Sequence, residues 1–188
     1  MEHNEIRFVP ISAGQWRQLR GAWLDMTATQ TGDDVGSIED AVAVSESGWR
    51  ERARALTGID CFAEALVSAA DSSGPWLGFV SGYFDDLAAD RNAFVTHMHA
   101  MHGDVETEAL LLDRVAQWAG LFAADALVVG IPEDRIDLLV RYEDHGFRRS
   151  GVRRRCDLDP QRYEVELAFD LAARSLGGGT GHRSLRTV

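Results

Sequence analysis

Two histidines, His97 and His99, are the residues of this sequence best suited to move a proton near neutral pH. They lie two positions apart in a segment that alternates as a β-strand does, so their side chains should share one face. Because an imidazole titrates near pH 6.5, either could take a proton from an ammonium group, directly or through water. The alternative is that both simply line a polar cleft. Because their titration range suits proton transfer, we name His97 and His99 as candidate bases.

A third histidine, His102, follows in the same segment, and three imidazoles at this spacing could hold zinc. The pattern is similar to the HxHxDH motif of the metallo-β-lactamase fold, with Met101 in place of the aspartate. Further ligands are not evident along the chain. We therefore expect no metal site.

A second segment with chemical potential is Tyr142-Glu143-Asp144-His145-Gly146-Phe147. It follows an apolar helical run and combines a phenol, a turn glycine and an apolar ring. A phenol with a pKa near 10 stays protonated at pH 7 and can donate its proton. The alternative interpretation of Tyr142 is a side chain that packs its helix onto a sheet.

Other charged and aromatic groups each have a simpler interpretation than ligand binding. Five arginines fall between positions 148 and 155, and such a run is usually a solvated face with its own ion pairs. The acidic residues Asp33, Asp34, Glu39 and Asp40 could attract a cation, but we interpret them as part of a solvated loop. Trp16, Trp23 and Trp49 are interpreted as core residues rather than substrate walls.

The pattern of apolar residues predicts the elements that position these groups. Tyr163, Val165, Leu167, Phe169 and Leu171 occupy alternate positions, which is the clearest strand signal in the chain. The predicted strands are 6–11, 62–70, 76–84, 93–100, 126–131, 147–156 and 163–171. The predicted helices are 16–24 after an N-cap at Ser12, 49–56, 104–119 and 136–144, with a loop over 27–47 that has room for one short helix.

The long helix 104–119 determines how the middle of the sheet should be connected. It joins strand 93–100 to strand 126–131, and a helix between two strands of one sheet makes them parallel. Segment 126–131 is an uninterrupted apolar run, as expected for a strand covered on both faces. We expect an α/β (α+β) fold with a mixed, mostly antiparallel sheet of about seven strands and helices on both faces.

Length and charge restrict the class of protein. The chain has 188 residues, 45% hydrophobic and 26% charged, which predicts one domain over 1–172 and a flexible tail over 173–188. A net charge of −11 disfavours nucleic acids and anionic membranes as partners and is compatible with a cationic or amine substrate. Cys61 and Cys156 form no CxxC motif, and there is no signal peptide or membrane-length apolar run. We therefore expect a cytoplasmic protein with reduced thiols.

The order and spacing of several segments resemble the GNAT superfamily of N-acetyltransferases. The likeness extends from Ile6 to Leu171. The segments that carry it are 62–64, 77–83, 93–100, 117–119, 141–147 and 163–167. The resemblance implies acetyl-CoA or another acyl-CoA as co-substrate, a primary amine of a small molecule or protein as acceptor, and direct transfer between them. It also makes a homodimer one expected assembly.

The resemblance implies roles for individual residues. The strands 93–100 and 126–131 should splay apart, with the pantetheine arm between them. Tyr142 matches the tyrosine that protonates the departing CoA thiolate, and His97 or His99 would assist the base step. The expected cofactor-binding residues are Met98, Ala100, Met101, Gly103, Asp104, Arg135 and Arg141.

The loop before the long helix departs from the family pattern Gln/Arg-x-x-Gly-x-Gly/Ala, in which backbone N–H groups surround the pyrophosphate. In this sequence the loop looks about three residues shorter than the family pattern, and Gly103 is the one glycine of that pattern still present. Asp104, Glu106 and Glu108 bring three carboxylates to the helix start. At an effective dielectric constant of ~20 and a separation of ~5 Å, each would repel a phosphate charge by about 3 kcal/mol.

Two hypotheses follow from this departure. In the first, Arg135 and Arg141 compensate for the carboxylates and the chain is an N-acyltransferase. In the second, the chain is a GNAT-like binding or regulatory module that does not bind CoA in the usual way.

Overall fold

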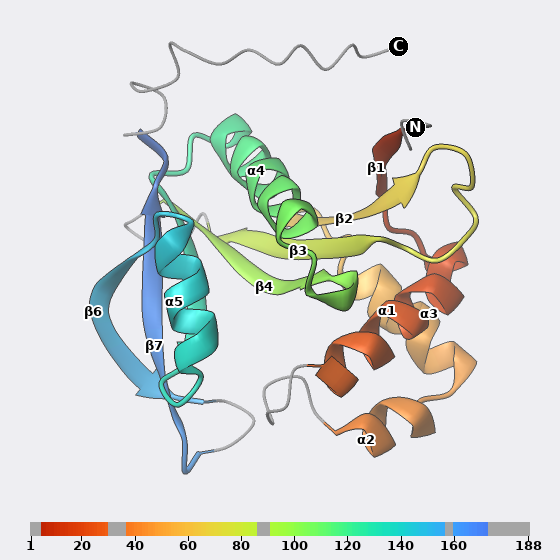
Figure 1. The fold of residues 1–188 in the computed structure, drawn as a ribbon, viewed down its shortest axis with the longest axis horizontal. Coiled ribbons are helices and arrows are strands. Elements are labelled where there is room, and N and C mark those ends of the chain that lie inside the picture. The colour runs from red at the N-terminus through yellow and green to blue at the C-terminus, as the bar shows by residue number, and fades with distance from the viewer. Residues whose placement is uncertain (1–4, 30–36, 86–90, 157–159, 173–188) are drawn as a thin grey trace.

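A computed structural model describes residues 5–29, 37–85, 91–156 and 160–172, and shows one seven-stranded sheet with helices on both faces (Figure 1). The strands are β1 (Ile6–Pro10), β2 (Cys61–Ser68), β3 (Gly78–Asp85), β4 (Asn92–Ala100), β5 (Ala126–Pro132), β6 (Arg148–Arg155) and β7 (Tyr163–Asp170). The helices are α1 (Trp16–Thr29), α2 (Ile38–Ala43), α3 (Glu46–Ala55), α4 (Val105–Leu121) and α5 (Ile136–Asp144). The predicted fold class is confirmed.

The sheet has the order β1-β2-β3-β4-β5-β7-β6, and its neighbours are antiparallel except for β4 and β5. The parallel pairing that the long helix predicted is therefore confirmed. It is short, since it joins only Asn92, Ala93 and Phe94 to Ala126, Leu127 and Val128. Beyond these pairs β4 and β5 no longer pair with each other, as expected if the two strands splay apart.

Two hydrophobic clusters hold the helices against the sheet. One joins β2–β5 and β7 to α4 and α5, through buried side chains such as Leu111 and Leu139. The other joins β2 and β3 to α1, α2 and α3, and contains Trp23 and Trp49. Burying one large apolar side chain contributes about 1.5–3 kcal/mol, so these clusters fix the helices on their faces. Trp16 packs against the second cluster, which confirms the three tryptophans as packing residues.

A bulge interrupts the pairing of β3 with β4 at Thr96. Gly82 is opposite Val95 and Ser81 is opposite His97, so Thr96 is the extra residue of β4. A Cβ at Gly82 would lie 2.4 Å from the carbonyl oxygen of Phe94, so the strands can approach this closely only at a glycine. The bulge places His97 beside Ser81 while β4 leaves its parallel partner.

Most predicted boundaries agree with the structure, and α5 spans the predicted residues. Two helices differ. The first continues to Thr29, whereas a loop was predicted from Thr27, because Met26 in its last turns is buried in the second cluster. The third begins at Glu46 instead of Trp49, because the Ser45 hydroxyl caps it by accepting from the amide of Gly48 at 3.2 Å.

The predicted strands are confirmed with shifts of one or two residues at their ends, and the short helix allowed between 27 and 47 is α2. Ser12 precedes a 3-10 turn at Ala13–Gln15, where the Gln15 side chain accepts from the Ser12 amide at 2.8 Å. Asp33, Asp34 and the predicted tail 173–188 lie outside the described residues. Within the described ranges, no helix combines the length and apolarity needed to cross a membrane.

The basic strand β6 is an edge strand, exposed along its length. Its arginines form ion pairs with acids on neighbouring elements, including Arg149 with Glu143 at 3.0 Å and Arg153 with Glu133 at 2.8 Å. The interpretation of this run as a solvated, ion-paired face is therefore confirmed.

Candidate functional site

A cavity of about 610 Å³ lies where β4 and β5 diverge. Residues 94–100 of β4 and 129–132 of β5 form its sides. Met26 and Thr29 of α1 border it from one face of the sheet, and Leu138 and Tyr142 of α5 border it from the other. The cavity is therefore bordered by helices from both faces, and two ligands could meet within the gap.

Tyr142 lies on the α5 side of this cavity and is 5% exposed. Its ring packs edge-on against Phe147 with the centroids 5.2 Å apart, and Gly146, at φ 94°, turns the chain so that Phe147 reaches it. Burial raises the pKa of Tyr142 well above its usual range, and the negative charge of Glu108 adds to that effect. The phenol is therefore protonated throughout the neutral range and can act only as a proton donor there.

His99 lies on the opposite side of the gap, facing α1, and is 4% exposed. Its Nε2 is 2.7 Å from a carboxylate oxygen of Asp25, which α1 carries. Burial lowers the pKa of His99, although the hydrogen bond and the charge of Asp25 act in the opposite direction. His99 is thus a neutral imidazole at pH 7 with an acidic partner, which is an arrangement suited to accepting a proton.

His97 shares the α1 face but is held differently. Its Nδ1 lies 3.0 Å from the hydroxyl of Ser81, which is also 2.9 Å from the hydroxyl of Thr96, and its ring packs 4.6 Å from that of Trp23. Burial lowers the pKa of His97 to about 4, and the positive charge of Arg52 acts in the same direction. A base of that pKa is a poor acceptor for an ammonium proton at pH 7, so His99 is the better candidate of the two.

The loop before α4 is a 3-10 turn at Met101–Gly103, in which His102 and Gly103 have positive φ values of 58° and 68°. Asp104 is the N-cap of α4, and its carboxylate accepts from the amide of Thr107 at 3.0 Å. That hydrogen bond lowers the pKa of Asp104. One of the amides that a helix start offers to an anion is therefore already occupied by the chain's own carboxylate.

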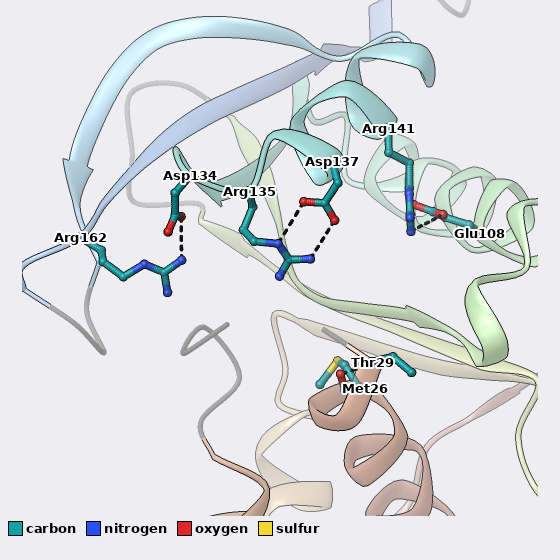
Figure 2. A network of polar contacts seen from close by, with 8 residues as sticks. All are labelled: Met26, Thr29, Glu108, Asp134, Arg135, Asp137, Arg141 and Arg162. Carbon is teal, nitrogen blue, oxygen red and sulfur yellow. Dashed lines mark hydrogen bonds and ion pairs between the residues drawn. The ribbon is translucent and has the colours of Figure 1, made fainter. Parts of the chain in front are cut away.

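Glu108, one turn further along α4, is the one of the three predicted acids that borders the cavity. Its side chain is 5% exposed, and its Oε2 lies 3.4 Å from Nη1 of Arg141 (Figure 2). Burial raises the pKa of Glu108, while the charges of Arg141 and His145 oppose the rise. Glu106, in contrast, is exposed and does not border the cavity. Only one of the three predicted carboxylates therefore faces a ligand in the gap.

The arginines expected to compensate for these acids are themselves paired. Arg135 makes two hydrogen bonds to Asp137, of 3.1 and 3.0 Å, and Arg141 contacts Glu108. Figure 2 shows these pairs in a row along α5 and the turn before it, with the end of α1 below them in this view. Both arginines border the cavity, so each can reach a ligand there only in competition with its acid.

The structure brings most of the predicted site residues together around one cavity. Tyr142, His97, His99, Met98, Ala100, Gly103, Arg135 and Arg141 border it, whereas Met101 and Asp104 do not. Sequence reasoning missed Asp25, because 74 positions separate it from His99 and no motif joins them. Across the described ranges, no three His, Cys, Asp or Glu side chains gather closely enough to hold a metal ion.

Comparison with solved structures identifies the fold. A GNAT-family acetyltransferase from Streptococcus pneumoniae superposes with a TM-score of 0.65 at 12% identity, covering 88% of this chain and 99% of that one. The spermidine N-acetyltransferase of Vibrio cholerae, in complex with CoA and spermine, gives 0.67 at 10% identity over 89% and 96%. An aminoglycoside 6′-acetyltransferase of type Ii gives 0.61 at 12% identity over 88% and 97%.

At the sequence level, no protein-family model and no curated protein matches the chain. The identities to the solved structures are low, so these likenesses establish the GNAT fold, and the chemistry must be argued from the site.

Proposed function

We propose that this protein is an N-acetyltransferase that moves an acetyl group from acetyl-CoA to a primary amine of a small molecule or protein. The observation that carries the proposal is the gap between β4 and β5, with a buried phenol on one side and a carboxylate-paired imidazole on the other. A proton donor and a proton acceptor on opposite sides of one cavity are the two groups that acyl transfer to an amine requires.

The gap suits the extended, amide-containing arm of CoA. Because β4 pairs with β5 only as far as Phe94, the backbone of residues 95–100 faces β5 without a ladder partner on that strand. A strand edge of this kind offers hydrogen bonds to an extended ligand, as in β-strand addition. A volume of about 610 Å³ is in the range of small-molecule sites. The backbone of Met98 to Ala100 is the proposed contact for the pantetheine amides, whereas Met101, which was also expected there, does not border the cavity.

The chemistry assigns one step to each side of the gap. His99 removes a proton from the acceptor's ammonium group, and the neutral nitrogen attacks the thioester carbonyl. As the carbon–sulfur bond breaks, Tyr142 donates its phenolic proton to the departing sulfur. The attacking nitrogen loses its second proton to solvent as the amide forms, and solvent returns a proton to Tyr142 while His99 releases the one it took. The products are the amide, the free thiol of CoA and one net proton. General acid and general base steps of this kind each contribute about 10²–10⁴ in rate.

The phosphates of CoA are the part of the donor that this chain holds least favourably. The arginines that border the cavity are Arg135, Arg141 and Arg154, and each is bound to an acid. Asp104 occupies an amide of the α4 start, and Glu108 adds a negative charge beside the gap. We therefore expect weak binding of acetyl-CoA compared with a helix start free of carboxylates.

The same observation favours a second candidate, a GNAT-like binding or regulatory module that excludes CoA. Replacing Asp104, Glu106 and Glu108 together with Gly, Gly and Lys separates the two candidates. If the native chain already binds acetyl-CoA, the second candidate is wrong. If binding is detected only in the triple variant, the carboxylates exclude the donor and the transferase proposal is wrong.

The transferase proposal is tested by calorimetry with acetyl-CoA at millimolar concentration and by release of the CoA thiol in the presence of spermidine and other primary amines. Spermidine is a useful first acceptor because it is cationic, this chain has a net charge of −11, and a protein of the same fold acts on it. Tyr142→Phe should lower kcat by about tenfold or more and leave the acetyl-CoA affinity within about twofold. The proposal fails if acetyl-CoA gives neither heat nor thiol release above the amine-free rate.

A further inference from the structure

We propose that Asp25 is a positioning residue that holds His99 with its proton on Nε2, which leaves Nδ1 as the atom that takes the proton of the acceptor. The proposal rests on the proposed function, because it names how one group of that site is prepared for its step. Asp25 does not touch the reacting atoms in this scheme and acts through His99.

The geometry of the pair comes from two elements that are distant in sequence. Asp25 lies on α1 and His99 on β4, and the oxygen and Nε2 are 2.7 Å apart. His99 is 4% exposed, whereas the side chain of Asp25 is 25% exposed, so the carboxylate keeps contact with solvent while the imidazole does not. A short, charge-assisted hydrogen bond to a buried ring fixes the orientation of that ring.

The tautomer follows from the chemistry of the two groups. An ionised carboxylate can only accept hydrogen bonds, so Nε2 must carry the proton when His99 is neutral. The lone pair is then on Nδ1, and no described residue forms a hydrogen bond to that atom. The ring of Phe79 packs against His99 with the centroids 6.5 Å apart and limits its rotation. The basic nitrogen is therefore selected before any acceptor arrives.

The charged surroundings of His99 leave Asp25 as its main partner. The carboxylate of Asp25, on α1, favours the protonated form of His99. The charge of His102, in the turn after β4, disfavours that form. From β3 the neighbour is the apolar Phe79. Once His99 has taken a proton, Asp25 is thus the group that stabilises the resulting imidazolium in a buried position.

A structural tie between α1 and β4 is the alternative role for this hydrogen bond, and Asp25→Asn separates the two. The amide can still hydrogen-bond to Nε2 and so preserve the tie. It lacks the negative charge, and if its NH₂ group donates to Nε2 the proton moves to Nδ1. A loss caused by structure would appear equally with every acceptor.

The experiment compares the wild type, Asp25→Asn and Glu46→Gln with acetyl-CoA and two probe acceptors. Spermidine carries ammonium groups at pH 7, so a base must remove a proton before its nitrogen can attack. Methoxyamine is already unprotonated at pH 7 and needs no such base. Asp25→Asn should lower kcat with spermidine by about tenfold or more, lower it clearly less with methoxyamine, and leave KM for acetyl-CoA within about twofold. Glu46→Gln, which removes an exposed pair with Arg50, should match the wild type. Nitrogen-15 NMR of His99 in the full chain should show the proton on Nε2.

The outcomes distinguish this inference from the function on which it rests. If the wild type acetylates neither probe, the proposed function fails and this role for Asp25 fails with it. If the wild type is active but Asp25→Asn matches it, or loses equally with both acceptors, only the role of Asp25 is overturned. A neutral His99 with its proton on Nδ1 in the wild type overturns the role as well.

Discussion

Glu108→Gln should tighten the binding of acetyl-CoA, because Glu108 holds Arg141, one of the arginines that border the cavity. The carboxylate lies 3.4 Å from Nη1 of Arg141, and both side chains border the cavity. Glutamine keeps the shape and the hydrogen-bonding capacity of the side chain but removes its charge. Arg141 is then released to face a phosphate, and one source of repulsion disappears.

The magnitude follows from the distance and the exposure of the pair. At 3.4 Å and an effective dielectric constant of ~20, the Coulomb attraction is about 5 kcal/mol. The Arg141 side chain is 41% exposed, so solvent screening reduces the usable part to about 1–2 kcal/mol. Since 1.4 kcal/mol corresponds to a factor of ten, the affinity for acetyl-CoA should rise roughly 5- to 30-fold.

Titration calorimetry of acetyl-CoA binding to the wild type, Glu108→Gln and Glu106→Gln measures this effect. Glu106 lies two residues earlier on α4 but is exposed and away from the cavity, so its variant should change the affinity by less than about twofold. Burial raises the pKa of Glu108, so the wild type should approach the variant as the pH falls and Glu108 takes up a proton. Equal affinities for the wild type and Glu108→Gln, or an equal gain in Glu106→Gln, would refute the reasoning.

Two further predictions concern stability. Burial lowers the pKa of His97 to about 4 in the folded chain, whereas a free imidazole has a pKa of about 6.5. Between these two values the unfolded chain binds one more proton than the folded chain, so stability should fall as the pH drops from about 6.5 to about 4. His97→Asn should remove on the order of 2 kcal/mol of that fall in chemical denaturation at several pH values, and an unchanged slope would contradict the assignment. Gly82→Ala should cost about 2–3 kcal/mol, because its Cβ would lie 2.4 Å from the carbonyl oxygen of Phe94. Gly21→Ala, where no atom lies within 4 Å, is the control and should be neutral or stabilising by up to about 1 kcal/mol; equal losses in the two variants would count against the close approach at the bulge.

The elements of this fold could be predicted where local patterns are strong. Helix α5 has the predicted bounds because an apolar face and the glycine at 146 mark it without help from the rest of the chain. The end of α1 could not be predicted, since Thr27 has low helix propensity, and the last turns stay helical because Met26 is buried in the cluster with Trp23 and Trp49. Local propensity is overridden there by contacts that exist only once the helix has formed.

The site was predictable in its parts but not in its pairings. His99 could be placed on a strand face, yet its partner Asp25 depends on how α1 crosses that face. Glu108 was predicted to repel phosphate as a first-turn carboxylate together with Asp104 and Glu106, but the three acids differ in burial and partners. Pattern alone could not distinguish an acid that caps a helix from one that is buried beside a cavity.

The placement of His99 favours the transferase over the binding module on energetic grounds. A buried imidazole loses hydration, and a hydrogen bond to Asp25 offsets that cost for one of its two nitrogens only. A module that only binds a partner has no use for an imidazole whose Nδ1 lacks a hydrogen-bond partner among the described residues. A base needs that uncommitted nitrogen. The acids near the start of α4 weaken the hold on the donor's phosphates, but they leave both the imidazole and the phenol of Tyr142 intact, so they should lower donor affinity rather than abolish the chemistry.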